Sequence, residues 1–386
     1  MDFIPYSRQE VTDEDVAAVV GVLRSDFLTQ GPAVVEFEHA FAHAHGVAHA
    51  VAVSNATAGL HIGCLALDVG PRSTVWTSSN SFLASANCAL YCGARVDFVD
   101  IDPRTRNMSI DALRAKLESA SRNGTLPSVV VPVDFSGLPC DLKEMRALAD
   151  RYGFRILEDA SHAVGATYLG RPVGSAHAHA TVFSFHAVKV VTTAEGGVVT
   201  THDDGLAARL RLLRSHGMTR DPATLQRRSE GAWYYEQHVL GFNYRLTDLQ
   251  AALGTSQLRR LVDMQQHRKE RADRYDALLA SLPLLLPARL PDRESSWHLY
   301  AVEVDETRAA SDRASVFGLM RDAGIGVNVH YLPIHLQPYY LGLGFKPGDF
   351  PATERYASRA ISLPLFPALT DAQQDRVVAA LKAALA

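Results

Sequence analysis

The 386-residue chain lacks several features that mark particular classes of protein. It has no run of Lys or Arg and a formal net charge of −4, so a general electrostatic affinity for nucleic acid or membrane is not indicated. No uninterrupted apolar segment approaches the roughly 20 residues of a membrane span. The first 15 residues, MDFIPYSRQEVTDED, contain no apolar stretch after a basic segment, unlike a signal peptide.

Cysteine is also scarce, with four in the chain. Cys88 and Cys92 are four residues apart and have no partnered Cys or His nearby, which makes a poor metal site. We therefore expect a cytoplasmic protein with reduced cysteines and no metal.

Apolar residues make up 47% of the chain, enough for a sizeable core. From about residue 50 to 200, short apolar runs alternate with amphipathic stretches, and this pattern predicts strands separated by helices. The expected strands are 50–54, 95–101, 128–135, 154–159, 181–185 and 197–201, and the clearest expected helix is 142–153. Such an order indicates an α/β fold with a mostly parallel sheet that helices flank on both faces.

After residue 200 the pattern changes to long helical segments. The segment 246–282 is too long for one ordinary helix, and we expect it to carry the chain between domains. A strand at 297–304 and a helix at 313–324 indicate a compact α+β unit. The prediction is a large domain over 1–254, which includes the N-terminal segment, and a smaller C-terminal domain over 255–386.

Three candidate sites lie where predicted strands end, the usual place for functional groups in an α/β sheet. Asp159 closes one strand, although it is also suited to cap a helix that starts at Ala160. The segment 54–58, SNATA, suits a bound phosphate and equally suits plain helix capping. Lys189 follows Ser184 in an apolar run, where desolvation favours a neutral, nucleophilic amine; the alternative is a surface lysine.

Together the three sites match one cofactor, pyridoxal 5′-phosphate (PLP). Its aldehyde needs a lysine, its phosphate needs hydroxyl and N–H donors, and its pyridine nitrogen needs a carboxylate. Lys189, Ser184 with Thr57, and Asp159 meet these needs in turn.

Seven segments resemble the DegT/DnrJ group of sugar aminotransferases, which have PLP fold type I. They occur in the family's order along nearly the whole chain: SDFLTQGP (25–32), SNATAGLH (54–61), VDIDP (99–103), LEDASHAVGATYLGRPVGS (157–175), FSFHAVKVVTTAEGG (183–197), GFNYRLTDLQAALG (241–254) and ISLPLFPALT (361–370). Within the family, segments 182–197, 214–218 and 329–340 most resemble the 4-aminotransferases of pseudaminic acid synthesis, which act on a UDP-linked 4-keto sugar.

The resemblance implies a role for each matching residue. Lys189, Asp159 and His162 are the implied catalytic residues, and His162 stands beside the cofactor's phenolic oxygen. Phe82 is similar to the ring that stacks over the pyridine. The implied phosphate ligands are Ala56, Thr57 and Ser184 from one chain and Asn243 from its neighbour. Arg245 is the implied clamp for the amino donor's carboxylate, and Tyr6, Arg8, His330 and Tyr331, with His335, are candidates for the sugar nucleotide.

Two departures from the family pattern leave the lysine and the aspartate untouched. Many members have Gly-Thr where this chain has Ala56-Thr57, and many have Gly-Asp where this chain has His177 to Ala180. We expect His177 and His179 to line the start of the strand, since no third metal ligand is near.

The resemblance implies a homodimer with shared active sites that transfers the amino group of L-glutamate to a nucleotide-linked keto sugar. The alternatives are a dTDP- or GDP-linked sugar aminated at C3 or C4, a sugar 3-dehydratase, or a PLP-binding regulator without turnover. The dehydratases replace the lysine with histidine, whereas Lys189 is present here. The regulators carry an added DNA-binding domain, for which this chain has no spare segment or basic recognition helix.

Overall fold

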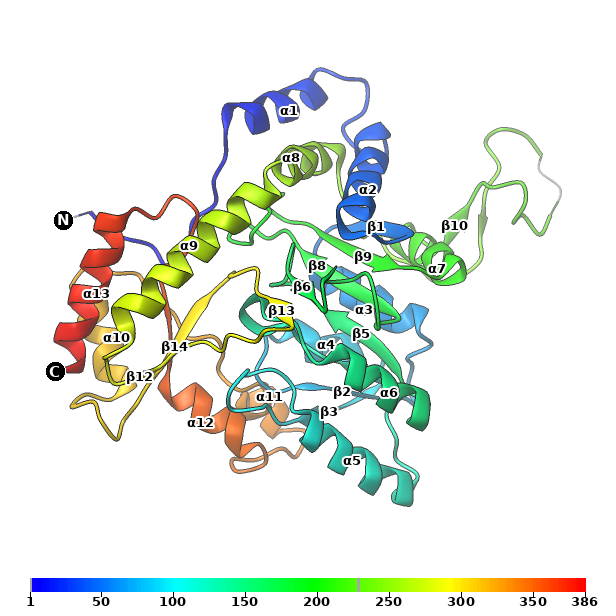
Figure 1. The fold of residues 1–386 in the computed structure, drawn as a ribbon. Coiled ribbons are helices and arrows are strands. Elements are labelled where there is room, and N and C mark those ends of the chain that lie inside the picture. Colours follow the sequence, from blue (N-terminus) through cyan, green and yellow to red (C-terminus); the bar gives the residue numbers. More distant parts are fainter. Residues whose placement is uncertain (1, 228–229) are drawn as a thin grey trace.

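The computed structural model describes residues 2–227 and 230–386. Its centre is a seven-stranded sheet in the order β1-β9-β8-β5-β4-β2-β3 (Figure 1). The strands are β1 (His49–Val53), β9 (Gly197–Thr201), β8 (Ala180–Ser184), β5 (Arg155–Asp159), β4 (Val129–Val131), β2 (Thr74–Ser78) and β3 (Arg95–Val99). Strand β9 is antiparallel to both neighbours, and every other neighbouring pair is parallel.

Helices cover both faces of this sheet because its strands are apolar on both sides. Along β1, Val51 and Val53 belong to a core with α3 (Ala56–Ala66), α4 (Ala84–Tyr91) and α7 (Asp204–Arg214). Ala50 and Ala52 point to the opposite face, as alternation in a strand requires. That face is covered by α2 (Pro32–His45), α5 (Ile110–Asn123), α6 (Leu142–Tyr152) and α8 (Asp248–Leu258).

The C-terminal part has its own core, around the antiparallel sheet β12-β14-β15. Its strands are β12 (Leu284–Leu285), β14 (Tyr300–Val304) and β15 (Ala360–Leu363), and its helices include α10 (Arg313–Asp322) and α13 (Asp371–Leu385). Helix α9 (Leu261–Leu279) joins the two parts. Its first turns pack Leu261 and Met264 into the core of the large sheet, and its last turns pack Tyr275 and Leu279 into the C-terminal core.

The remaining elements are short or peripheral. Helix α1 (Asp13–Leu23) packs against α8, while β10 and β11 form an arm that projects from the body (Figure 1). The bounds are β6 (Thr167–Tyr168), β7 (Arg171–Pro172), β10 (Met218–Thr219), β11 (Glu236–Gln237), β13 (Arg293–Glu294), α11 (Pro338–Leu341), α12 (Pro351–Arg359) and the 3-10 turns Phe135–Gly137 and Ile334–Leu336. Within the described residues, no helix is both long and apolar enough to cross a membrane.

The expected α/β architecture with a mostly parallel sheet is confirmed, with differences in detail. The strand expected at 128–135 ends at Val131, and Pro132, which has no N–H to donate, follows it. Strand β2 was not predicted, because Thr74, Thr77 and Ser78 give it a polar composition. The strand expected from 297 begins at Tyr300, since Trp297 has a left-handed backbone (φ 53°).

The expected helical segment 246–282 is two helices, α8 and α9. The predicted domain boundary after residue 254 falls inside α8 and stays a prediction. Residue Ile4 of the N-terminal segment packs in the C-terminal core, although that segment was assigned to the large domain.

Candidate active site

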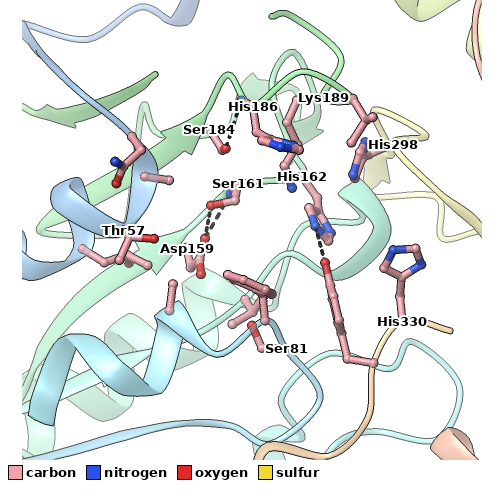
Figure 2. Close-up of a pocket in the computed structure, with 18 of the residues that line it drawn as sticks. Thr57, Ser81, Asp159, Ser161, His162, Ser184, His186, Lys189, His298 and His330 are labelled. Atoms are coloured by element: carbon pink, nitrogen blue, oxygen red, sulfur yellow. Dashed lines mark hydrogen bonds between the residues drawn. The ribbon is translucent and has the colours of Figure 1, made fainter. Parts of the chain in front are cut away.

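A cavity of about 880 Å³ lies at the carboxyl ends of the parallel strands. Three of its walls come from the large sheet: the start of α3, the loop before α4, and the segments that follow β5 and β8. The fourth wall comes from Tyr6 of the N-terminal segment and from residues 328–331. The cavity therefore lies between the large sheet and the C-terminal part, and Figure 2 shows Asp159, Lys189 and His330 around it.

Most of the residues singled out in the sequence meet at this cavity. Those that line it are Tyr6, Ala56, Thr57, Phe82, Asp159, His162, Ser184, Lys189, His330 and Tyr331. Arg8, Asn243 and Arg245 are not among the residues that line it. Asn243 is exposed in the loop before α8, so a single chain does not bring it to the site.

Lys189 reaches the cavity from the turn that follows β8 (Figure 2). Its main-chain N–H donates to the carbonyl of His186 at 2.9 Å, and the hydroxyl of Ser7 donates to the carbonyl of Val188 at 3.3 Å. Within the described chain, its amine makes no hydrogen bond or ion pair. Burial lowers the pKa of Lys189 to about 8, and the negative charge of Asp159 partly opposes this shift. A large share of the amine is therefore neutral near pH 8.

Asp159 is buried at the end of β5 and is held by hydroxyl groups. Its Oδ1 accepts from the main-chain N–H and the hydroxyl of Ser161 at 3.1 and 2.6 Å, and its Oδ2 accepts from the hydroxyl of Ser85 at 2.6 Å. No helix starts at Ala160 in this described segment, which is a turn, so the alternative role as a helix cap is wrong. Donors that orient both oxygens suit a carboxylate that keeps its charge and direction.

The first turn of α3 presents free donors to the cavity. The side chain of Asn55 caps this helix by accepting from the N–H of Ala58 at 2.8 Å. The N–H groups of Ala56 and Thr57 and the hydroxyl of Thr57 have no partner in the described chain, as the first N–H groups of a helix usually lack one. Across from them, the hydroxyl of Ser184 accepts only a long bond of 3.4 Å from the N–H of His186. This arrangement can hold a phosphate.

His162 is a neutral imidazole with a fixed tautomer. The main-chain N–H of Ser136 donates to its Nδ1 at 3.2 Å, so its proton is on Nε2, which lies 3.0 Å from the hydroxyl oxygen of Tyr331. Burial and the nearby Lys189 hold the pKa of His162 well below its usual range. Because the oxygen of Tyr331 accepts from His162, the hydroxyl proton of Tyr331 remains available to a ligand.

The C-terminal wall carries further neutral hydrogen-bonding groups. His330 has its Nδ1 2.7 Å from the hydroxyl of Ser362, and burial lowers the pKa of His330 to about 3. The ring of Tyr6 lies 5.7 Å from His330, and the ring of Phe82 lies 6.4 Å from Tyr331. Phe82 is 58% exposed, which leaves one face of its ring open for stacking.

The other candidate histidines lie away from the cavity and contact other residues of the protein. His335, a candidate for the nucleotide, is fully buried between Ser79 and Glu354 at 2.6 and 2.9 Å and does not line the cavity, so that interpretation is wrong. His179 accepts from the N–H of Ile156 at 2.9 Å beside the start of β8, and the His177 ring packs on Tyr168. The described residues contain no group of three or more ligands that could hold a metal ion.

Ser161, Ser85 and His298 are among the residues of the site that were not predicted. Ser161 was detectable, because a hydroxyl two residues after an aspartate commonly forms a local turn with it. Ser85 and His298 come from distant segments and carry no local signal. The ring of His298 packs against that of His162 with centroids 4.4 Å apart and a tilt of 49°, and the Nδ1 of His298 has no hydrogen-bond partner in the described chain.

The donor set fits the cofactor predicted from the sequence. A partly neutral amine, a carboxylate held by hydroxyls and a cradle of free N–H and hydroxyl donors surround one cavity. These are the groups that the aldehyde, the pyridine nitrogen and the phosphate of PLP require.

The low pKa of Lys189 leads to a prediction about cofactor attachment. Only the neutral amine attacks an aldehyde, so the rate at which apo-protein takes up PLP should rise with pH through a midpoint near 8. Asp159→Asn removes the charge that raises the pKa of Lys189, so the midpoint should move to lower pH. Stopped-flow absorbance between about pH 6 and pH 10 measures this rate.

The control is Glu195→Gln. Glu195 also lines the cavity, but the pKa of Lys189 is set by burial and by the charge of Asp159, so this substitution should leave the midpoint unchanged. A midpoint near the ordinary lysine value of 10.5, or an upward shift in Asp159→Asn, would contradict the account of the amine.

Comparison with known proteins places the chain in a family. Residues 9–382 match the DegT/DnrJ/EryC1/StrS aminotransferase family. The chain is 42% identical over 383 residues to the spore coat polysaccharide biosynthesis protein SpsC of Bacillus subtilis strain 168, and the alignment covers 98% of this chain and 96% of SpsC.

Solved structures agree with this match. The chain superposes on Helicobacter pylori PseC, an aminotransferase involved in the biosynthesis of pseudoaminic acid, with a TM-score of 0.90 at 30% identity over 100% of this chain and 99% of PseC. The PLP form of the putative sugar aminotransferase Spr1654 from Streptococcus pneumoniae gives a TM-score of 0.88 at 30% identity over 99% and 98% of the two chains. The predictions of family, PLP fold type I, cofactor and enzyme class are confirmed. The chain belongs to the DegT/DnrJ/EryC1/StrS family of PLP-dependent sugar aminotransferases.

Proposed function

We propose that this enzyme moves the amino group of L-glutamate to C4 of a UDP-linked 4-keto-6-deoxy amino sugar. The observation that carries the proposal is the unpartnered Lys189 amine, with its pKa near 8, in a cavity that it shares with Asp159. When bound there, PLP supplies an aldehyde and a pyridine ring that stabilises negative charge on the reacting carbon.

Each wall of the cavity has a part in this proposal. Lys189 binds the aldehyde and then moves the proton at the reacting carbon, since its amine can both accept and release a proton near neutral pH. Asp159 would hold the pyridine nitrogen, and its orientation is fixed by Ser85 and Ser161. His162 would be the neutral group beside the phenolic oxygen. Phe82 would cover the ring, and the start of α3 with Ser184 would hold the phosphate.

The sugar nucleotide is assigned to the C-terminal wall. Tyr6, His330 and Tyr331 present hydroxyl and imidazole groups that are neutral at pH 7, because burial raises the pKa of both tyrosines and lowers that of His330. Neutral donors and acceptors can bind sugar hydroxyls without leaving a buried charge unpaired. Arg8 is proposed for the diphosphate. The choice of a UDP sugar is supported by the similarity to PseC alone. No residue that lines the cavity is assigned to the recognition of the nucleotide base.

The carboxylate of glutamate requires a cation, and we propose that a partner subunit supplies it. Arg245 and Asn243 do not line the cavity of their own chain, yet both lie in the loop that leads to α8. The nearby arm exposes Trp233, Tyr235 and Leu240, which are 72%, 52% and 81% accessible. Large exposed apolar side chains of this kind support an interface with a second copy. We therefore propose a two-fold homodimer in which each chain completes the other's site.

The proposal includes a cytoplasmic location. The four cysteines are buried and unpaired, as is usual in a reducing compartment.

A panel of acceptors tests the substrate. The enzyme, converted with glutamate to the pyridoxamine form, should regain the absorbance of the PLP form with a UDP-linked 4-keto-6-deoxy-HexNAc at least about 10-fold faster than with dTDP or GDP analogues. NMR of the product should place the new amine at C4. A preference for a dTDP or GDP sugar, or amination at C3, would refute the substrate and leave the enzyme class intact. A protein that binds PLP but shows no half-reaction with glutamate would instead indicate a regulator.

Subunit mixing tests the shared site. Lys189→Ala and Arg245→Ala should each be inactive alone, because one lacks the amine and the other lacks the donor clamp. After exchange, one site of every heterodimer contains both intact groups, so an equal mixture should recover about a quarter of wild-type activity.

The control mixes Lys189→Ala with Asp159→Ala. Both residues belong to one cavity of the same chain, so no heterodimer site is intact and no activity should return. Absence of recovery in the first mixture, after native mass spectrometry has shown exchange, would mean that each site is built within one chain.

A further inference from the structure

Two buried acids lie behind Asp159, away from the cavity. Glu158 precedes Asp159 on β5, so its side chain points to the opposite face of the sheet. Asp134 follows β4, the neighbouring strand. Both residues are 0% exposed, and their carboxyl groups lie within hydrogen-bonding reach of each other. Neither lines the cavity, so the proposed chemistry makes no direct use of them.

The hydrogen bonds around this pair leave one carboxyl oxygen of each residue without a donor. Oδ1 of Asp134 accepts from the N–H of Cys140 at 2.8 Å, and Oε2 of Glu158 accepts from the hydroxyl of Thr181 at 2.6 Å. Oδ2 of Asp134 and Oε1 of Glu158 are enclosed and have no donor in the described chain. Buried polar atoms are rarely left unpaired. A proton held between the two carboxyl groups satisfies both oxygens at once.

The charges around Glu158 and Asp134 also indicate that one of the two carboxyl groups is protonated. No Lys, Arg or His of the described chain forms an ion pair with Asp134 or Glu158, and Asp159 adds a third carboxylate beside them. Three neighbouring acids in a buried setting cannot all be ionised. Burial raises the pKa of Glu158 well above its usual range and that of Asp134 to about 7. The pair therefore holds one proton, which forms a hydrogen bond between the two carboxyl groups.

The main chain connects the pair to the site. The N–H of Asp134 donates to the carbonyl of Asp159 at 3.1 Å, and the N–H of Asp159 donates to the carbonyl of Pro132 at 2.8 Å. A displacement of Asp134 thus moves the end of β5.

We propose that Glu158 and Asp134 form a proton-sharing carboxyl pair that fixes the end of β5 and keeps one further negative charge away from Asp159. Both are positioning residues, which act through Asp159 and do not touch the substrate or the cofactor. The proposal rests on the proposed function in one respect, the role of Asp159 at the pyridine nitrogen.

Two substitutions of Glu158 distinguish its role as a hydrogen-bond donor to Asp134 from a role in packing alone. Glu158→Gln keeps the shape, since its amide N–H can donate to Asp134 while its oxygen accepts from Thr181. Glu158→Leu fills similar space but leaves Oδ2 of Asp134 without a donor.

Infrared spectroscopy of the apo-protein tests the shared proton directly. At pH 8, where exposed carboxyl groups are ionised, wild type should show the carbonyl band of one protonated carboxylic acid, sensitive to exchange into D2O. Glu158→Gln should lack this band, because its amide N–H takes the place of the shared proton. The exposed Glu118→Gln is the matched control and should keep it. A wild type without the band, or a band that persists in Glu158→Gln, would overturn the proposal. Glu158→Gln preserves the hydrogen bonds, so this test does not depend on Glu158→Leu being folded.

The positioning role is tested with the PLP-loaded protein. Glu158→Leu should slow the half-reaction with glutamate by about 100-fold, whereas Glu158→Gln should stay within about threefold of wild type. A Glu158→Gln protein as slow as Glu158→Leu would contradict the role. Asp159→Asn separates the two proposals: it should keep the infrared band but lose the half-reaction. If it loses neither, the function proposed for Asp159 fails while the proton-sharing pair stands.

Discussion

Desolvation of the Lys189 amine is the constraint on which the other features of the cavity depend. An amine that is removed from water without a partner loses proton affinity, and here its pKa falls to about 8. Burial also lowers the pKa of His162 and His330 and keeps both neutral. The positive charge of Lys189 adds to this effect, since it disfavours a further positive charge nearby. Asp159 opposes the effect of burial, since its negative charge raises the pKa of the amine.

The fold supplies these groups from separate segments and then holds them together. The parallel strands deliver Asp159 and the turn of Lys189 to one edge of the sheet, while the N-terminal segment fastens that turn through Ser7. Helix α9 belongs to both cores, so the C-terminal wall with Tyr331 is tied to the sheet that carries Lys189. On the sheet side, the main-chain N–H of Ser136 sets the tautomer of His162, and this tautomer presents its Nε2–H to the hydroxyl oxygen of Tyr331 in the C-terminal wall at 3.0 Å.

Much of this arrangement was predictable from the sequence because its signals are local. The ends of apolar strands place Asp159 and Lys189 at one edge of the sheet, and the polar turn before α3 contains Thr57. What could not be predicted depends on contacts between distant segments. Ser85 reaches Asp159 from 74 residues away, and His298 reaches the ring of His162 from the C-terminal part. His335 looked suitable by type, but its partners Ser79 and Glu354 hold it inside the core.

The proton proposed between Glu158 and Asp134 is another feature that could not be predicted from the sequence. Two acids on neighbouring strand ends give no sign in the sequence that they meet, and their unpaired oxygens become visible only when every donor around them is known. In this proposal, the carboxylate of Asp159 is held in place by a neighbouring pair of acids that share a proton.

The most direct test of the account is the position of the cofactor on the chain. PLP-loaded protein is reduced with borohydride, digested and mapped by peptide mass spectrometry. The account predicts that the pyridoxyl group lies on Lys189 in the segment FSFHAVK (183–189). A pyridoxyl group on any other lysine would contradict it.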